Sequence, residues 1–369
     1  MSTVSWTEDD NCPTARWHSE NGAPPPESSV VVDDWITADA ACRLARAGTG
    51  MLWRGDFHNA RQLLRAMGRR VERKIPLVDD PSEAFRRYRA SRRRRAQVLG
   101  RLLVLLEDDY SLALRRAPDV RRACTEAYGP PQGRTVVALT ELLGVLGAAQ
   151  WREKGVYVPA LGERVHPHYG VFSPVRGEYV ELVASAPLPA RAQTAFDLGT
   201  GTGVLAAVLG RRGFRRIIAT DNSLRALSCA RANLHRLGMS SVDVRGPALF
   251  PDGKADLVVC NPPWLPGTPT SALESGVYDE NSSMLHAFLS GLPAHLNPGG
   301  EGWLILSDLP ELLGLRPHNE LLHRITTVGL HITAQLTTRP THHRAHNPSS
   351  PLHHARARET TSLYRLAAR

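Results

Sequence analysis

The spacing of hydrophobic and polar residues along the chain changes near Tyr157. Between about Asp33 and Gln150, apolar residues recur at the intervals of amphipathic helices. After Tyr157, short apolar runs alternate with helical patterns, which is typical of a parallel α/β sheet. The pattern therefore predicts a helical domain over residues 33–155 and an α/β domain over residues 156–369.

The first 32 residues show neither pattern. The stretch from Asn21 to Ser29 is rich in proline and serine and offers few apolar side chains to a core. We therefore expect residues 1–32 to form a disordered tail.

Several helices are expected in the helical domain. Their expected ranges are 38–47, a segment around 57–67, a long helix from about 81 to 106, then 119–128 and 135–150. Arginines crowd the long helix, and the cluster from Arg92 to Arg95 is dense enough to neutralise phosphates of RNA. A solvated helix face is the alternative, because no aromatic residues for base stacking are interleaved.

The α/β domain contains four clear strand patterns, over residues 194–198, 217–221, 257–260 and 302–307. Helical patterns cover residues 204–212, 223–237 and 282–296. A last strand is expected over 360–366, and the segment 338–356, rich in histidine, arginine and proline, reads as a loop.

A glycine-rich loop follows the first of these strands. Gly199, Gly201 and Gly203, with Thr200 between the first two, let the backbone turn tightly and approach a ligand. Asp197 precedes this loop and can accept hydrogen bonds from an amino-acid ammonium group, which a nicotinamide cofactor lacks. The loop therefore favours a ligand with an amino-acid moiety, and a dinucleotide site or a structural turn is the alternative.

An acidic residue ends the second strand. Asp221, followed by Asn222, can accept hydrogen bonds from both hydroxyls of a ribose. A glycine loop with an acid at the end of the next strand is a moderately specific pattern. Together they predict a nucleoside cofactor.

The segment from Asn261 to Trp264 leaves the end of a buried strand, where ligands bind in open α/β sheets. Asn261 offers a side-chain oxygen, Pro262 offers a backbone carbonyl, Pro263 continues the loop and Trp264 offers a flat face. Two acceptors and a stacking ring suit a planar –NH2 group, because binding both hydrogens localises the lone pair of the nitrogen. A plain Asn-Pro-Pro turn is the alternative.

These motifs resemble the class I methyltransferases of the "small domain" group. That group includes the glutamine methyltransferase of peptide release factors and the guanine-N2 methyltransferases of ribosomal RNA. The resemblance extends from about Tyr169 to Leu366 and implies a Rossmann-like seven-stranded sheet. It also implies S-adenosyl-L-methionine as methyl donor and S-adenosylhomocysteine as product.

The resemblance assigns roles by position. Asp197, the three loop glycines and Asp221 match the cofactor site, and the segment from Asn261 to Trp264 matches the Asn-Pro-Pro-aromatic motif. Phe172 begins a segment that resembles the one capping the cofactor in these enzymes. One departure is that Pro247 and Ala248 stand where the family has an acid that contacts adenine. The residues before 150 match no known substrate domain.

Other residues have two readings each. Tyr278 and Asp279 follow the catalytic strand and either line the acceptor pocket or pack within their loop. The Trp53–Asp56 segment is either a helix entry or a substrate contact. The histidines of the 338–356 segment (His342, His343, His346, His353 and His354) lack the ordered spacing of a zinc site, so no metal is expected.

Composition changes this picture little. The formal net charge of +9 favours acidic partners such as nucleic acid, although an arginine- and alanine-rich chain from a GC-rich genome would also run basic. Five cysteines without a CxxC pair fit free thiols in a reducing compartment. With no signal peptide and no membrane-spanning run in the sequence, we expect a cytoplasmic protein.

The sequence thus predicts an S-adenosylmethionine-dependent N-methyltransferase whose acceptor is an amine or amide nitrogen of RNA or protein. Three alternatives remain open. In the first, the methyl acceptor is a small metabolite. In the second, the sulfonium is used for other chemistry such as cyclisation. In the third, the domain binds S-adenosylmethionine without catalysis.

Overall fold

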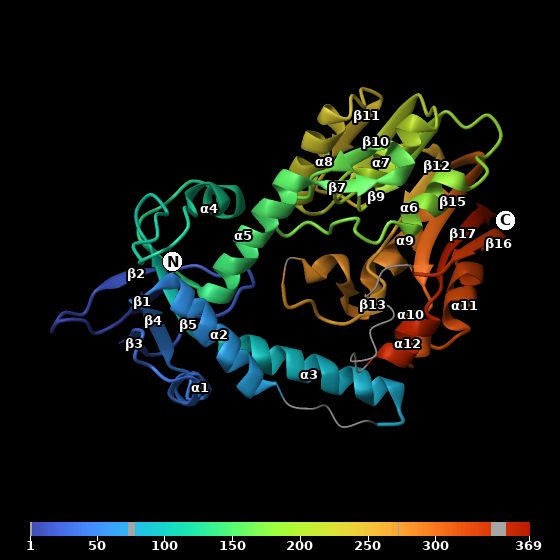
Figure 1. Cartoon of the computed structure of the whole chain (residues 1–369). Coiled ribbons are helices and arrows are strands. Elements are labelled where there is room, and N and C mark those ends of the chain that lie inside the picture. The colour runs from blue at the N-terminus through green and yellow to red at the C-terminus, as the bar shows by residue number, and fades with distance from the viewer. Residues whose placement is uncertain (1, 73–77, 272, 341–351) are drawn as a thin grey trace. The chain divides into compact units, whose positions relative to one another are not determined.

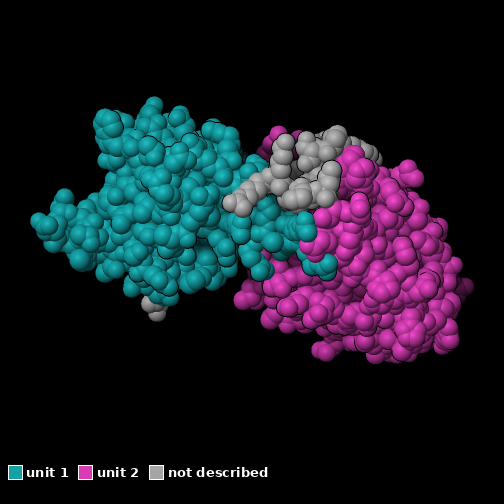
Figure 2. Space-filling model, turned by 90° about the horizontal axis from the view of Figure 1, so that it is seen from below, with its two compact units in different colours: residues 1–77, 86–150 teal, residues 78–85, 151–369 magenta. Residues whose placement is uncertain are grey.

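The computed structural model describes residues 2–72, 78–271, 273–340 and 352–369, which form two compact units (Figure 2). The N-terminal unit comprises residues 1–77 and 86–150, and the C-terminal unit comprises residues 78–85 and 151–369. Each unit has a sheet of its own.

The C-terminal unit is built on a seven-stranded sheet (Figure 1). In spatial order its strands are β11 (Val242–Arg245), β10 (Arg216–Thr220), β9 (Thr194–Leu198), β12 (Ala255–Cys260), β15 (Leu296–Ser307), β17 (Thr361–Ala368) and β16 (Leu330–Thr338). The first five are paired in parallel, and β17 is antiparallel to both of its neighbours. The predicted seven-stranded α/β sheet is confirmed.

Helices cover both faces of this sheet. One face packs against α6 (Glu178–Ser185), α7 (Val204–Arg211) and α8 (Leu224–Arg236), and the other packs against α9 (Ser283–His295) and α11 (Glu320–Thr327). Successive strand residues point to opposite faces, so Ala195 joins the first core cluster and Phe196 the second. Burial on both faces explains why the central strands β9, β10 and β12 are largely apolar runs in the sequence, whereas the edge strands β11 and β16 alternate.

Short elements complete the C-terminal unit. They are β7 (Val156–Val158), η1 (Pro159–Leu161), β8 (Glu163–Val165), β13 (Leu265–Pro266), η2 (Glu274–Gly276), β14 (Tyr278–Asp279), η3 (Glu280–Ser282), α10 (Leu309–Leu312) and α12 (His353–Arg358). The last corrects the expected loop over 338–356, because its C-terminal part is helical. Residues 341–351 of that segment, with His342, His343 and His346, lie outside the described residues.

The N-terminal unit contains a six-stranded sheet with the order β1-β2-β6-β5-β4-β3. Its strands are β1 (Thr3–Ser5), β2 (Thr14–Trp17), β3 (Ser29–Val32), β4 (Gly50–Trp53), β5 (Leu102–Leu106) and β6 (Thr135–Ala138). Its helices are α1 (Ala38–Arg46), α2 (Phe57–Val71), α3 (Pro81–Leu99), α4 (Arg121–Tyr128) and α5 (Leu139–Lys154), of which α3 and α5 extend into the C-terminal unit.

The expected disordered tail over residues 1–32 is wrong. β1, β2 and β3 lie within it, and Val4 and Trp6 are 3% and 2% exposed. Both side chains pack with Leu52 and Leu103 of the central strands. Burial of these two side chains stabilises the first strands, although the turn-forming residues around Pro24 suggested a disordered segment.

The expected all-helical N-terminal domain is also wrong. The apolar run that was predicted to continue the long helix is the buried strand β5, separated from α3 by Gly100 and Arg101. Likewise, the predicted helix over 135–150 begins with β6 before α5 starts at Leu139. The predicted helices near 38–47, 57–67 and 119–128 are present as α1, α2 and α4.

Within the described residues, no helix combines the length and the apolar character needed to cross a bilayer.

Candidate functional site

The candidate site lies at the carboxyl edge of the C-terminal sheet, where the direction of strand succession reverses. From β9 the chain proceeds through β10 to β11 on one side, and β12 and β15 lie on the other. Leu198, the last residue of β9, pairs with Cys260, the last residue of β12. The glycine loop and the Asn261–Trp264 loop therefore start side by side at the position where such sheets bind ligands.

The glycine loop depends on backbone conformations that favour glycine. Gly199 and Gly203 have φ values of +70° and +82°. A Cβ on Gly203 would lie 3.2 Å from Leu234 and 3.3 Å from the backbone of Ala230, so this glycine allows α8 to pack against the loop. At Gly199 an added Cβ would clash with the terminal methyl of Met284, which places that side chain over the loop.

Asp197 stabilises the glycine loop through hydrogen bonds. Its Oδ2 accepts hydrogen bonds from the Thr200 hydroxyl at 2.6 Å and from the backbone N–H of Ala206 at 3.0 Å. The carboxyl is buried, and its Oδ1 has no hydrogen-bond partner among the described residues. Burial, together with the nearby Asp221, raises the pKa of Asp197 to about 6. A buried oxygen without a partner fits a cationic or hydrogen-bonding ligand.

Asp221 connects the glycine loop to the end of β10. Its Oδ2 accepts from the N–H of Gly201 at 3.0 Å, and its Oδ1 accepts from the N–H of Ser223 at 2.8 Å. Burial raises the pKa of the Asp221 carboxyl. The backbone N–H of Asn222 also lowers this pKa by hydrogen bonding, but a carboxylate has about four acceptor positions, so capacity remains for a ribose hydroxyl. Asn222, the next residue, is exposed.

In the Asn261–Trp264 loop, the indole N–H of Trp264 donates to the side-chain oxygen of Asn261 at 2.9 Å. Pro262 is buried, whereas Asn261, Pro263 and Trp264 are half-buried. The Trp264 ring also packs against both core clusters of the sheet. The hydrogen bond and this packing fix the indole. The Asn261 oxygen retains a second acceptor position.

The loop that follows folds back beside this segment. β13 begins directly after Trp264 and pairs in parallel with β14, so Leu265 lies opposite Tyr278. Tyr278 is buried, and Asp279 accepts from the Met284 N–H at 2.7 Å at the start of α9. The structure therefore brings Tyr278 to the predicted catalytic loop, although 14 positions separate it from Trp264.

The segment that begins at Phe172 reaches the same loop. A Cβ on Gly276 of η2 would lie 2.7 Å from the Phe172 Cβ, so the ring packs tightly there. The preceding Val171 packs against Ala226 and Cys229 of α8. This segment therefore contacts both the helix that follows Asp221 and the loop that follows Trp264.

The sequence analysis missed a buried acid at this edge of the sheet. Glu359 accepts from the Ser307 hydroxyl at 2.8 Å and lies 3.7 Å from the Arg176 guanidinium. Its second oxygen has no partner among the described residues, and burial raises the pKa of the carboxyl. The available signal was a lone acid just before the last strand of the sheet.

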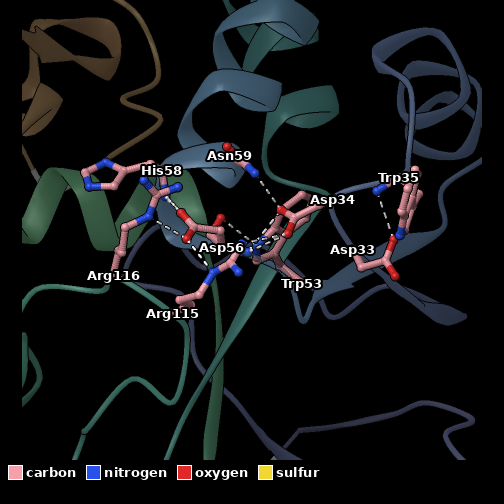
Figure 3. Close-up of polar contacts among 9 residues, drawn as sticks. All are labelled: Asp33, Asp34, Trp35, Trp53, Asp56, His58, Asn59, Arg115 and Arg116. Carbon is pink, nitrogen blue, oxygen red and sulfur yellow. Dashed lines mark hydrogen bonds and ion pairs between the residues drawn. The ribbon is translucent and has the colours of Figure 1, made fainter.

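The Trp53–Asp56 segment belongs to the N-terminal unit and supports its structure (Figure 3). Asp56 is buried and caps α2 by accepting from the His58 N–H at 2.9 Å. Its other oxygen accepts from Arg115 at 2.9 Å and Arg116 at 2.6 Å. These bonds join the loop after β4 to the loop after β5, which accounts for the segment as a helix entry.

Within the described residues, no group of three or more histidine, cysteine or acidic side chains is arranged to hold a metal ion. Cys260 is fully buried, which raises the pKa of its thiol well above the ordinary value and fits a core residue.

Comparison with known proteins connects the site to one family. Residues 163–312 match the family described as methyltransferase small domain. A release factor glutamine methyltransferase of Xylella fastidiosa is 38% identical over 127 residues, covering 30% of this chain and 44% of that protein. One of Mycobacterium tuberculosis is 35% identical over 167 residues, covering 42% of this chain and 50% of that protein.

Among solved structures, the ribosomal protein L11 methylase of Lactobacillus delbrueckii subsp. bulgaricus covers 59% of this chain and 92% of its own, with 17% identity and a TM-score of 0.40. The chain spans half or less of the length of the two release factor methyltransferases.

Proposed function

With a methyltransferase small domain over residues 163–312 as the premise, we propose that the chain is an S-adenosylmethionine-dependent N-methyltransferase. The acceptor that we propose is a planar amine or amide nitrogen of RNA or protein.

One observation carries this proposal. The glycine loop after β9 and the Asn261–Trp264 loop after β12 start from paired residues, Leu198 and Cys260. A donor held by the first loop and an acceptor held by the second would therefore meet at one edge of the sheet. Holding both reactants in line accounts for a large part of such a rate enhancement.

The residues of the first loop fit the cofactor. The unpartnered Oδ1 of Asp197 suits the ammonium group of a methionine moiety or its water, and the remaining acceptor capacity of the Asp221 carboxylate suits a ribose hydroxyl. When bound, S-adenosylmethionine supplies an electrophilic methyl group on a sulfonium. Gly199, Gly201 and Gly203 allow the backbone to approach it.

The residues of the second loop fit a planar nitrogen. Asn261 Oδ1 and the Pro262 carbonyl accept the two N–H groups, which localises the nitrogen lone pair toward the methyl donor. Trp264, fixed by its bond to Asn261, stacks on the flat group, and Pro263 limits the motion of the loop. Tyr278 and Phe172 line the acceptor and donor sides respectively.

Two observations bear on the acceptor. The relatives named release factor glutamine methyltransferase support a protein amide. The net charge of +9 supports RNA. A small-metabolite acceptor is the alternative that the experiment separates from both.

The test begins with calorimetric binding of S-adenosylmethionine to the purified chain. Methyl transfer is then followed by mass spectrometry with total RNA, peptide release factors and a small-metabolite extract as separate acceptors. Methylated RNA or protein supports the proposal, and turnover with the extract alone moves the acceptor to a metabolite. An absence of S-adenosylmethionine binding overturns the proposal.

A further inference from the structure

Helix α3 carries an unusual concentration of positive charge. Seven of the ten residues from 86 to 95 are arginine, and no acidic residue occurs between Glu83 and Glu107. At a rise of about 1.5 Å per residue, these charges fall within about 15 Å of helix. This part of α3 belongs to the N-terminal unit, and Figure 1 shows α3 as one continuous helix.

Most of these side chains face solvent. We define the arginine face as the exposed residues Arg86, Arg87, Arg92, Arg93 and Arg94. Arg92, Arg93 and Arg94 form no hydrogen bond or ion pair with any residue in the described ranges. By contrast, Arg122 of α4 pairs with Glu126 one turn further along, and Arg324 of α11 pairs in the same way with Glu320.

Such a face is costly for an isolated protein. Arg92 and Arg93 lie three and four positions after Arg89, and Arg95 lies three positions after Arg92. Like charges at this spacing on a helix repel each other, and α3 contains no acidic residue after Glu83. A solvated helix face normally alternates charges of both signs. The concentration of positive charge on α3 therefore favours a polyanionic partner that neutralises it.

The residues beside the arginine face narrow the class of partner. A helix that lies in a membrane interface needs a large apolar face, but the other exposed positions after Phe85 are Ala90, Ala96 and Gln97. Along α3, no exposed aromatic residue is available to stack on bases, because Phe85 is buried and Tyr88 is half-buried. This favours a partner recognised by its backbone phosphates, with little dependence on base sequence.

We propose that the arginine face of α3 binds the phosphodiester backbone of a nucleic acid. A role of this binding in recruiting an RNA acceptor to the methyltransferase rests on the proposed function. The binding itself requires neither the cofactor nor methyl transfer.

The experiment measures binding of a fluorescein-labelled RNA duplex to the full chain by anisotropy, at salt concentrations from about 50 to 200 mM. The test variant replaces Arg92, Arg93 and Arg94 with glutamine, which keeps helix propensity and removes three charges. We expect binding to weaken roughly tenfold or more at the low-salt end. The slope of log affinity against log salt should also fall by about 0.9 for each arginine removed.

The matched control removes the same charge elsewhere. Arg191, Arg215 and Arg216 are exposed and lie at the amino edge of the C-terminal sheet, where β9 and β10 begin. Their triple glutamine variant should bind RNA like the wild type. A second test variant, with lysine at positions 92, 93 and 94, keeps the charge and should retain most of the binding and its salt dependence.

Equal binding by the wild type and the glutamine variant of α3 overturns the proposal, as does an equal loss in the control. Displacement of the RNA by polyglutamate as readily as by unlabelled RNA also overturns it, in favour of an acidic protein. Preference for RNA over a DNA duplex of the same sequence supports the proposal and identifies RNA as the source of the phosphates. Equal affinity supports recognition of the backbone alone.

Calorimetric binding of S-adenosylmethionine to the same variants separates the two proposals. Cofactor binding without RNA binding overturns only the role of the arginine face. RNA binding without cofactor binding overturns only the proposed methyltransferase.

Discussion

The indole N–H of Trp264 donates a hydrogen bond of 2.9 Å to the side-chain oxygen of Asn261, three positions earlier in the same loop. The oxygen that we propose binds the acceptor nitrogen therefore also orients the aromatic ring that stacks on it. Since an amide oxygen accepts two hydrogen bonds, one position remains for the acceptor. Asn261 and Trp264 should consequently act as a unit, with mutational effects that are not additive.

Replacing Asn261 with alanine should lower the rate of methyl transfer by on the order of 100-fold, because the acceptor nitrogen loses one of its two hydrogen-bond acceptors. The affinity for S-adenosylmethionine should change little, since the cofactor residues lie on the other loop. Single-turnover rates and calorimetry measure the two quantities separately. Full activity in Asn261→Ala would remove the proposed mechanism.

Trp264→Phe is the partner experiment. It keeps a flat ring but removes the indole donor, so we expect a smaller loss of rate than in Asn261→Ala. In the double variant, the effect of the Trp264 change should be much reduced. Additive effects of the two substitutions would show that the hydrogen bond has no functional coupling.

The centre of the C-terminal sheet was predictable because β9, β10, β12 and the end of β15 are largely buried and therefore appear as apolar runs. The edge strands β11 and β16, which are partly exposed, were not predicted. β9 follows the predicted range, and the glycine loop marks its end. The N-terminal sheet was not predictable in the same way. The apolar run from Leu102 to Leu106 is consistent with the end of a helix or with a strand. Only its pairing with β4 and β6 shows that it is a strand.

The candidate site shows the same division. Asp197, Asp221 and Asn261 each follow from local motifs at strand ends. The position of Tyr278 depends on a pairing with Leu265 across a loop, and that of Glu359 depends on the antiparallel return of β17 beside β15. Contacts of this kind join residues distant in the sequence and leave no periodic signal in it.

The stability of the cofactor-free protein should depend on the titration of Asp197. Burial raises the pKa of this carboxyl from 3.8 to about 6, so the folded protein retains a proton that the unfolded chain has lost. Below about pH 3.8 this carboxyl is protonated in both the folded and the unfolded chain, so it does not change the free energy of unfolding. Between about pH 4 and 6 the free energy of unfolding should fall by about 3 kcal/mol in total on its account.

Chemical denaturation of the wild type and Asp197→Asn across this pH range measures the effect. The difference between the two curves isolates Asp197 from the other titrating groups. Parallel curves would show that Asp197 is ionised at its ordinary pKa.

Cofactor affinity should show the opposite pH dependence. An ammonium group interacts favourably with the ionised form of Asp197, which is present above about pH 6. Calorimetric affinity for S-adenosylmethionine should therefore weaken by up to about tenfold per pH unit as the pH falls below that value. Asp197→Asn should bind weakly with little dependence on pH, and a steep dependence in this variant would assign the titration to another group.

Asp56→Ala should destabilise the N-terminal unit more than the loss of an ordinary helix cap. Asp56 caps α2 and also accepts from Arg115 and Arg116, whereas Thr37 only caps α1 through the Ala40 N–H. The comparison variant Thr37→Ala should cost about 1 kcal/mol in chemical denaturation. Equal costs would mean that the two arginines add nothing.

The pKa of Asp56 is held well below its ordinary value, mainly by the hydrogen bond from Arg116. The stabilisation from this group is therefore complete above the unfolded pKa near 3.8 and is lost as the pH falls through the lower folded value. Asp56→Ala should be less sensitive to acid than the wild type between these two values.

Gly203→Ala should test whether the glycine loop depends on close packing of α8 as well as on backbone conformation. Gly213 offers a matched control, since its φ of +92° resembles the +82° of Gly203, but no atom lies within 4 Å of an added Cβ. Gly213→Ala should therefore lower the free energy of unfolding by about 1 kcal/mol, the cost of a left-handed alanine. At Gly203 the added methyl meets Leu234 and Ala230, so we expect a further loss of about 1–3 kcal/mol from overpacking.

Displacement of the loop should also weaken S-adenosylmethionine binding in Gly203→Ala but not in Gly213→Ala. Equal losses of stability in the two variants would show that α8 yields to the methyl group without cost, and that the third glycine is needed only for its backbone conformation.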